Sequence, residues 1–279
     1  MTSVTPNPAL APAALPAYPR PQKVTQARVL RSEWTKLRTQ PSVRWALLSA
    51  VILVIGFGVG YSLLRAARPP RGAAAAAFDP ASVSLAGVQL AQIAAGVLGV
   101  LLITSEYATG LIRATFTAVP RRLPVLWGKA ATLAAATAAV TLPAAVAAFA
   151  AGQMILGRHH LAVPLSHPGA ARAVLGSALY LAVAALLGLA LGALLRSTAG
   201  GISALFALLF AVPIAAGFLP GPWPADIGKF LPATAGQAIT TASPDPASSL
   251  PPWTGFGLFC AYAAALLGLA AIRMRRGDA

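Results

Sequence analysis

Residues able to perform chemistry are few in this chain, and their spacing matches none of the common catalytic motifs. The sequence has no GxxxxGK[ST] phosphate loop, no HExxH zinc pair, no GxSxG nucleophile elbow and, with Cys260 as its single cysteine, no CxxC pair. His159, His160 and His167 lie in a stretch with Pro and Gly but without neighbouring acids, so we expect no metal there. We therefore expect a chain that is not an enzyme, holds no cofactor and does not bind ATP itself.

The large positive charge has to be weighed together with the apolar composition. The chain has 21 Lys plus Arg against 6 Asp plus Glu, a formal net charge of +15. However, 57% of its 279 residues are hydrophobic, a composition that excludes an ordinary soluble domain. The basic residues thus indicate membrane topology and attraction to anionic membrane lipids, and we expect no nucleic-acid partner.

Six apolar stretches are long enough to cross the hydrocarbon layer as helices, which needs roughly 20 residues each. An all-α, polytopic membrane protein is the predicted fold class, because a helix satisfies its backbone polar groups without water. The predicted spans are Trp45–Leu64, Ser84–Ser105, Val125–Leu156, Ala173–Leu195, Ala199–Leu219 and Thr254–Ile272.

The distribution of Lys and Arg between the connecting segments predicts the orientation. With the amino terminus inside, 15 of the 21 basic residues fall on the cytoplasmic side and 6 outside. We expect a multi-pass protein of the plasma membrane with both termini cytoplasmic. The chain then divides into a disordered Pro/Ala-rich tail (1–24), an amphipathic interfacial helix (25–41) and a six-span domain (42–279).

The predicted amphipathic helix carries Leu30, Trp34 and Leu37 on one face, with Arg31 and Arg38 outside it. Its apolar face is suited to the headgroup boundary, with Trp34 as an interfacial anchor. Two interpretations stay open at this point. The segment is either a basic flank without a partner or a helix that also docks a cytoplasmic protein.

The segment between the second and third spans is too short to cross a membrane and is expected to form a second amphipathic element. It carries Arg113, Arg121 and Arg122, and its one acid is Glu106. An acid at the membrane edge is expected to pair with a cation, for example Arg113, Arg31 or Arg38. Such a link is either an ordinary interfacial ion pair or one that also transmits motion from a partner.

Three further features complete the predicted layout. Gly188 and Gly192 form a GxxxG pair that lets helices approach closely, either inside the chain or between subunits. The Pro- and aromatic-rich stretch 220–252 is expected to form short interfacial helices. The loops Arg65–Ala81 and Arg158–Arg172 are expected to be solvated.

Three motifs resemble the permease subunits of ABC-2-type ATP-binding cassette transporters. They are LRSEWTKLRTQPSVRWALL before the first span, TSEYATGLIRATFTAVPRRLPVLWGKA after the second, and LPATAGQAI before the last. The run from Glu106 to Arg122 is the most specific of these. Together with the six spans, the resemblance covers the chain from about residue 25 onward.

The resemblance implies an ABC-2-type permease fold and an efflux function in a transport complex. The chain would pair with a second copy or a related permease and would bind two separately encoded ATPase subunits. Carried over by position, the residues of the ATPase-coupling interface would be Arg31, Trp34, Lys36 and Arg38 in a connecting helix, and Glu106, Tyr107, Arg113, Arg121 and Arg122 in a coupling helix. The alternatives are a membrane sensor or scaffold that recruits cytoplasmic partners without transport and, with less support, a lipid-modifying enzyme.

Overall fold

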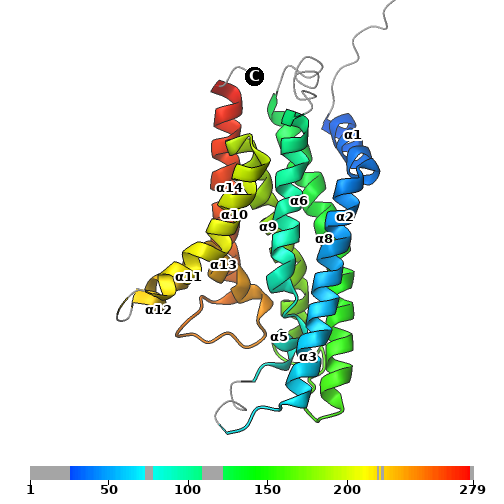
Figure 1. Ribbon diagram of the computed structural model, residues 1–279, viewed down its shortest axis with the longest axis vertical. Helices are drawn as coiled ribbons and strands as arrows, with labels where there is room; N and C mark the ends of the chain where they lie inside the picture. The colour runs from blue at the N-terminus through cyan, green and yellow to red at the C-terminus, as the bar shows by residue number, and fades with distance from the viewer. Residues whose placement is uncertain (1–25, 73–77, 109–121, 219, 221–222, 277–279) are drawn as a thin grey trace, which may run out of the picture.

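The protein is a bundle of long helices, shown in Figure 1. The computed structural model describes residues 26–72, 78–108, 122–218, 220 and 223–276, and these residues form helices and connections without strands. Six helices are long and apolar enough to cross a membrane: Pro41–Ala67, Val88–Tyr107, Leu123–Gly157, Ala170–Leu195, Thr198–Gly217 and Pro252–Arg276. They confirm the six predicted spans, with every boundary within four residues of its prediction.

The first span is preceded by a separate helix that turns away from it. Helix α1 covers Gln26–Thr39, and Gln40 is extended, with φ −76° and ψ 116°. Pro41 then begins α2 (Pro41–Ile52), as expected for a residue without a backbone N–H to donate. The span continues through a π-helical turn (η1, Leu53–Phe57) into α3 (Gly58–Ala67).

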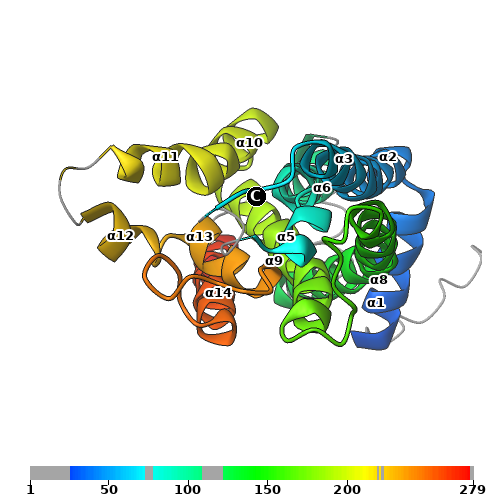
Figure 2. The ribbon, with the colours of Figure 1, turned by 90° about the horizontal axis from the view of Figure 1, so that it is seen from below.

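Helix α9 (Ala170–Leu195) forms the centre of the bundle. It packs against α6 (Val88–Ala108), α8 (Arg122–Gly157) and α14 (Pro252–Arg276), and Figure 2 shows it between α8 and α14. A Cβ at Gly188 would overlap the carbonyl oxygen of Gly96 on α6, and one at Gly192 would meet the Ile103 side chain at 2.7 Å. The GxxxG pair therefore lies at a contact inside this chain, where small residues bring two backbones together.

The fifth span diverges from the bundle, as Figure 1 shows. It begins with α10 (Thr198–Phe206), passes through a π-helical turn (η2, Ala207–Ala211) and continues as α11 (Val212–Gly217). Pro213 follows the π-helical turn, at the place where a missing N–H disturbs the helical hydrogen bonds. Two short helices, α12 (Trp223–Gly228) and α13 (Pro232–Gln237), and the 3₁₀ turn η3 (Ala238–Thr240) occupy the predicted interfacial stretch.

Asp79 anchors the end of the bundle opposite to α1. It caps the short helix α5 (Pro80–Ser84), and its carboxylate accepts hydrogen bonds from the backbone N–H groups of Ala81, Ser82, Ala242 and Ser243 and from the Ser82 hydroxyl. Burial alone would raise the pKa of Asp79, but these donors hold it below its ordinary value. The prediction of a solvated loop was wrong at this residue, because Asp79 joins residues more than 160 positions apart.

Candidate functional site

Four charged side chains from three helices meet near the end of the bundle that carries α1. Glu33 and Lys36 come from α1, Glu106 from the end of α6, and Lys129 from the beginning of α8. Lys129 lies 2.6 Å from Glu33 and 2.9 Å from Glu106, and Lys36 lies 2.9 Å from Glu33 and 3.1 Å from Glu106. We call these four residues the ionic cluster. Each lysine contacts both acids, so the cluster is a closed ring of alternating charge.

Three members of the ionic cluster are buried. Lys129 is 1% exposed, Glu33 2% and Glu106 7%, whereas the Lys36 side chain is 43% exposed. Removing such charges from water is unfavourable by several kcal/mol per ion, and it is tolerated when every charge is paired with good geometry. With two acids and two lysines, the ring has no net charge and meets that condition.

The electrostatic environment keeps the members on α1 ionised. Burial alone would raise the pKa of Glu33, but the charges and hydrogen bonds of Lys129 and Lys36 lower it below its ordinary value. Burial alone would lower the pKa of Lys36, but the nearby carboxylates of Glu33 and Glu106 raise it above its ordinary value. Both pKa shifts favour the charged forms near neutral pH.

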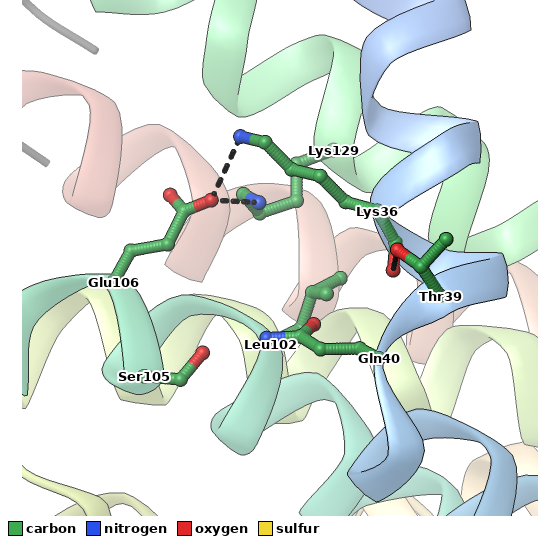
Figure 3. A pocket seen from close by; sticks show the side chains of 7 residues that line it. All are labelled: Lys36, Thr39, Gln40, Leu102, Ser105, Glu106 and Lys129. Carbon is green, nitrogen blue, oxygen red and sulfur yellow. Dashed lines mark hydrogen bonds and ion pairs between the residues drawn. The ribbon is translucent and has the colours of Figure 1, made fainter. Parts of the chain in front are cut away.

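A cavity of about 190 Å³ opens beside the ionic cluster. Its lining, drawn in Figure 3, includes Lys36, Lys129 and Glu106, and both lysine ammonium groups are directed at the Glu106 carboxylate. Thr39 and Gln40, at the junction of α1 and α2, complete one wall of the cavity. The cavity thus borders three of the four members of the ionic cluster.

The end of α6 also contacts the corner between α9 and α10. The Arg196 guanidinium lies over the Tyr107 ring, 5.6 Å from its centroid, and the Thr198 hydroxyl bonds to that of Thr104 at 2.9 Å. Arg196 adopts a left-handed conformation (φ 53°) that ends α9. Residues 104–107 of α6 thus connect α1 and α8 with the start of the fifth span.

The remaining residues of the expected coupling interface are placed as follows. Arg31 and Arg38 are exposed on α1, and Trp34 is 42% exposed. Arg122 begins α8, whereas Arg113 and Arg121 lie outside the described residues, as does the tail 1–24.

Glu106 forms the expected ion pairs, but its partners are Lys36 and Lys129 instead of Arg31 or Arg38. Glu33 is buried and Lys36 is half-buried beside Glu106, whereas Arg31 and Arg38 are exposed and form no ion pair within the described ranges.

Two members of the ionic cluster, Glu33 and Lys129, were not singled out by the sequence reasoning. Glu33 precedes Lys36 by one helical turn, which is the ordinary spacing of a surface ion pair. Lys129 stands seven residues inside α8, and a lysine within an apolar helix is expected to face the bundle and to be paired. That signal was present, but it does not identify the partner, which is 96 residues away in the chain.

Among the described residues, no group of three or more His, Cys, Asp or Glu side chains is arranged to hold a metal ion. The arrangement at the ionic cluster is suited to joining helices and to re-pairing charges. Comparison with known proteins adds no relative to this picture: no family model matches the chain, and no curated protein is similar to it.

Proposed function

We propose that this chain is the permease subunit of an ATP-binding cassette exporter of the ABC-2 type. In this proposal it forms the translocation path in the plasma membrane together with a second permease. Separate ATPase subunits supply the energy from the cytoplasmic side, where both termini lie. The proposal starts from the resemblance of three sequence motifs and is supported by the six apolar helices and the position of the ionic cluster.

The proposed coupling mechanism is supported by one observation, the position of the ionic cluster beside the expected coupling element. Residues 109–121, which hold the expected coupling element, are flanked by α6 and α8, and both helices contribute to the ionic cluster. Glu106 lies three residues before this segment and Lys129 lies two turns into the helix that follows it, and their charged groups are 2.9 Å apart. A force applied to the segment by a partner therefore acts on both sides of the cluster at once, and through Glu33 and Lys36 on α1.

The proposed mechanism has two states of the ionic cluster. In the state described here the ring is closed and α1 is held against α6 and α8. Closure of the ATPases on ATP would displace the 109–121 segment and α1, exchange the partners in the ring, and tilt the attached spans between inward and outward access. Because α6 is packed on α9 through small residues, a shift of α6 is passed to the centre of the bundle.

Purification from native membranes in mild detergent tests the complex. We expect a Walker-type ATPase to copurify, and we expect Arg113→Glu to reduce the amount recovered by tenfold or more (~1.4 kcal/mol) through charge reversal at the contact. The matched control is Arg68→Glu, the same reversal at an exposed residue at the opposite end of the first span. Full ATP-independent transport by a preparation without ATPase would overturn the proposal. A stable ATPase complex that moves no cargo in vesicles would favour the sensor or scaffold.

Cysteine labelling tests the orientation separately. Cys260 is the single cysteine, so Cys260→Ala provides a cysteine-free background. Thr39→Cys and Arg158→Cys then place one exposed thiol at each end of the bundle. We expect a membrane-impermeant maleimide to label position 158 in intact cells and position 39 only in inverted vesicles. The reverse pattern would place α1 outside and would contradict coupling to a cytoplasmic ATPase.

A further inference from the structure

A lateral groove lies where α1, α2 and α8 meet, on a different side of α1 from the ionic cluster. Its volume is about 280 Å³. Trp34 and Arg38 line it from α1, Arg44 and Leu47 from α2, and Ala139 and Val140 from α8. The groove thus combines an apolar wall contributed by two spans with two guanidinium groups at the level where α1 joins the first span.

The two arginines of the groove carry charge that no described acid neutralises. Both are exposed, and none of the ion pairs formed within the described ranges includes Arg38 or Arg44. The acids nearest in this part of the fold, Glu33 and Glu106, are already bound to Lys36 and Lys129. An occupant of the groove therefore has to bring its own negative charge.

The position of the groove specifies what the rest of that occupant looks like. The apolar span begins at Pro41, so Arg38 and Arg44 flank the boundary between the polar helix α1 and the hydrocarbon-spanning helix. Trp34 and Trp45, which are 42% and 70% exposed, lie at the same boundary, where tryptophan is favoured in membrane proteins. Deeper in the groove, Leu47 and Val140 offer contacts only to an apolar chain.

We infer that this groove is a binding site for an anionic phospholipid. The phosphate-bearing headgroup lies between Arg38 and Arg44, and one acyl chain lies along Leu47, Ala139 and Val140. Guanidinium groups suit a phosphate because they donate paired hydrogen bonds and are weakly hydrated. A second copy of the chain is a poor occupant, because the same face would bring its own Arg38 and Arg44 against this pair. The bound lipid would hold α1 against α2 and α8 at a different side of α1 from the ionic cluster.

Quenching of Trp34 fluorescence by brominated lipids tests the site. Replacing Trp45, Trp127, Trp223 and Trp253 by Phe leaves Trp34 as the only tryptophan, since the chain has 5. The purified full chain, without any ATPase, is placed in bilayers of unlabelled phosphatidylcholine with increasing brominated phosphatidylglycerol or brominated phosphatidylcholine. We expect half-maximal quenching at a much lower fraction of the anionic lipid.

Two variants separate the headgroup from the acyl chain. Arg38→Gln with Arg44→Gln should weaken the preference for phosphatidylglycerol by about tenfold or more, given the usual contribution of a basic residue at a membrane surface. Ala139→Phe should fill the groove and reduce quenching without a change in charge. Arg275→Gln with Arg276→Gln is the matched control, because it removes two exposed charges at the same end of the bundle, on α14.

The possible results divide clearly. Selective quenching that is lost in the two groove variants and kept in the α14 control supports the site. Equal quenching by both lipids, or an equal loss in the α14 control, overturns it, because the groove is then filled without headgroup recognition or by general surface charge. Size-exclusion profiles matching the parent show that each variant is folded. The experiment contains no ATPase, so its result is independent of the proposed transport function.

Discussion

The two ends of the bundle each use a carboxylate to join distant segments, but they surround it with different partners. At one end, Glu33 and Glu106 are held by Lys36 and Lys129, so every bond in the ionic cluster joins two charged side chains. At the other end, Asp79 is held by four backbone N–H groups and one hydroxyl. Arg172 contributes nearby by donating to the backbone oxygens of Thr241 and Ala242.

The kind of hydrogen-bond partner at each end indicates which end is suited to move. Backbone donors are fixed by the local fold, so the hydrogen bonds of Asp79 form a rigid cap. The ionic cluster consists of long side chains on three helices and is bordered by a cavity, so a change of partners among them would not require any helix to unfold. We therefore regard the Asp79 end as an anchor and the ionic cluster as the joint.

Removal of one lysine from the ionic cluster should have the largest effect. Lys129→Met leaves two buried carboxylates with only the partly exposed Lys36, and we expect a loss of about 3–5 kcal/mol in the free energy of unfolding. Thermal unfolding in detergent measures it. Lys229→Met, which removes a lysine outside the cluster, is the control and should shift the midpoint little. A Lys129→Met protein as stable as the parent would show that the buried charges are not interdependent.

Neutralising the whole ionic cluster should restore most of the free energy of unfolding that is lost in Lys129→Met. A quadruple variant with Glu33→Gln, Lys36→Met, Glu106→Gln and Lys129→Met has no uncompensated buried charge, and such replacements are often close to neutral in stability. We expect unfolding within about 1–2 kcal/mol of the parent. If the proposed transport function holds, this stable variant should still bind the proposed ATPase but should no longer couple ATP hydrolysis to transport. Normal coupling would make the cluster a purely structural feature.

At the anchor, Asp79→Asn should have a smaller effect. The substituted amide keeps one acceptor oxygen but places an NH₂ group opposite backbone donors, so some bonds to Ala242 and Ser243 are lost. We expect a destabilisation of about 1–3 kcal/mol, the usual range for an unsatisfied buried group. Hydrogen exchange of residues 242–243 should increase, while that of α1 stays unchanged. Protection changes in α1 would contradict the independence of the two ends.

The dependence of stability on pH should distinguish the two ends most finely. The pKa of Glu33 is lowered from 4.5 and that of Asp79 from 3.8, so both contribute stability that is present above these values and lost as pH falls through the lower, folded-state pKa. The pKa of Lys36 is raised from 10.5, so its contribution is present below that value and lost as pH rises through the higher, folded-state pKa.

The stability of the quadruple variant should therefore no longer fall at alkaline pH through Lys36 (the alkaline limb of the profile). It should still fall at acid pH through protonation of Asp79 (part of the acid limb). Asp79→Asn should retain the alkaline limb. Unfolding midpoints of the three proteins between pH 3 and pH 11, roughly spanning these groups, provide the measurement. An unchanged alkaline limb in the quadruple variant would show that Lys36 does not contribute through its pKa.

Much of the fold follows from hydropathy alone. The six spans are confirmed because about 20 apolar residues in succession have one stable arrangement in a hydrocarbon layer, which makes the signal local and strong. The break between α1 and α2 follows from Pro41 in the same way. For the site, the sequence indicated Glu106 and its need for a cation but pointed to the arginines.

Local sequence patterns were enough to predict the six spans to within four residues and the gathering of charge beside the first three of them. Helix packing, in contrast, sets the partners: Lys129 pairs with Glu33 across 96 residues and Lys36 with Glu106 across 70, and Asp79 accepts a hydrogen bond from Ala242. This division arises because hydropathy and helix periodicity are properties of neighbouring residues. The partner of a buried charge is set instead by how helices rotate and pack, and that is decided by small residues such as Gly188 at contacts far from the charges themselves.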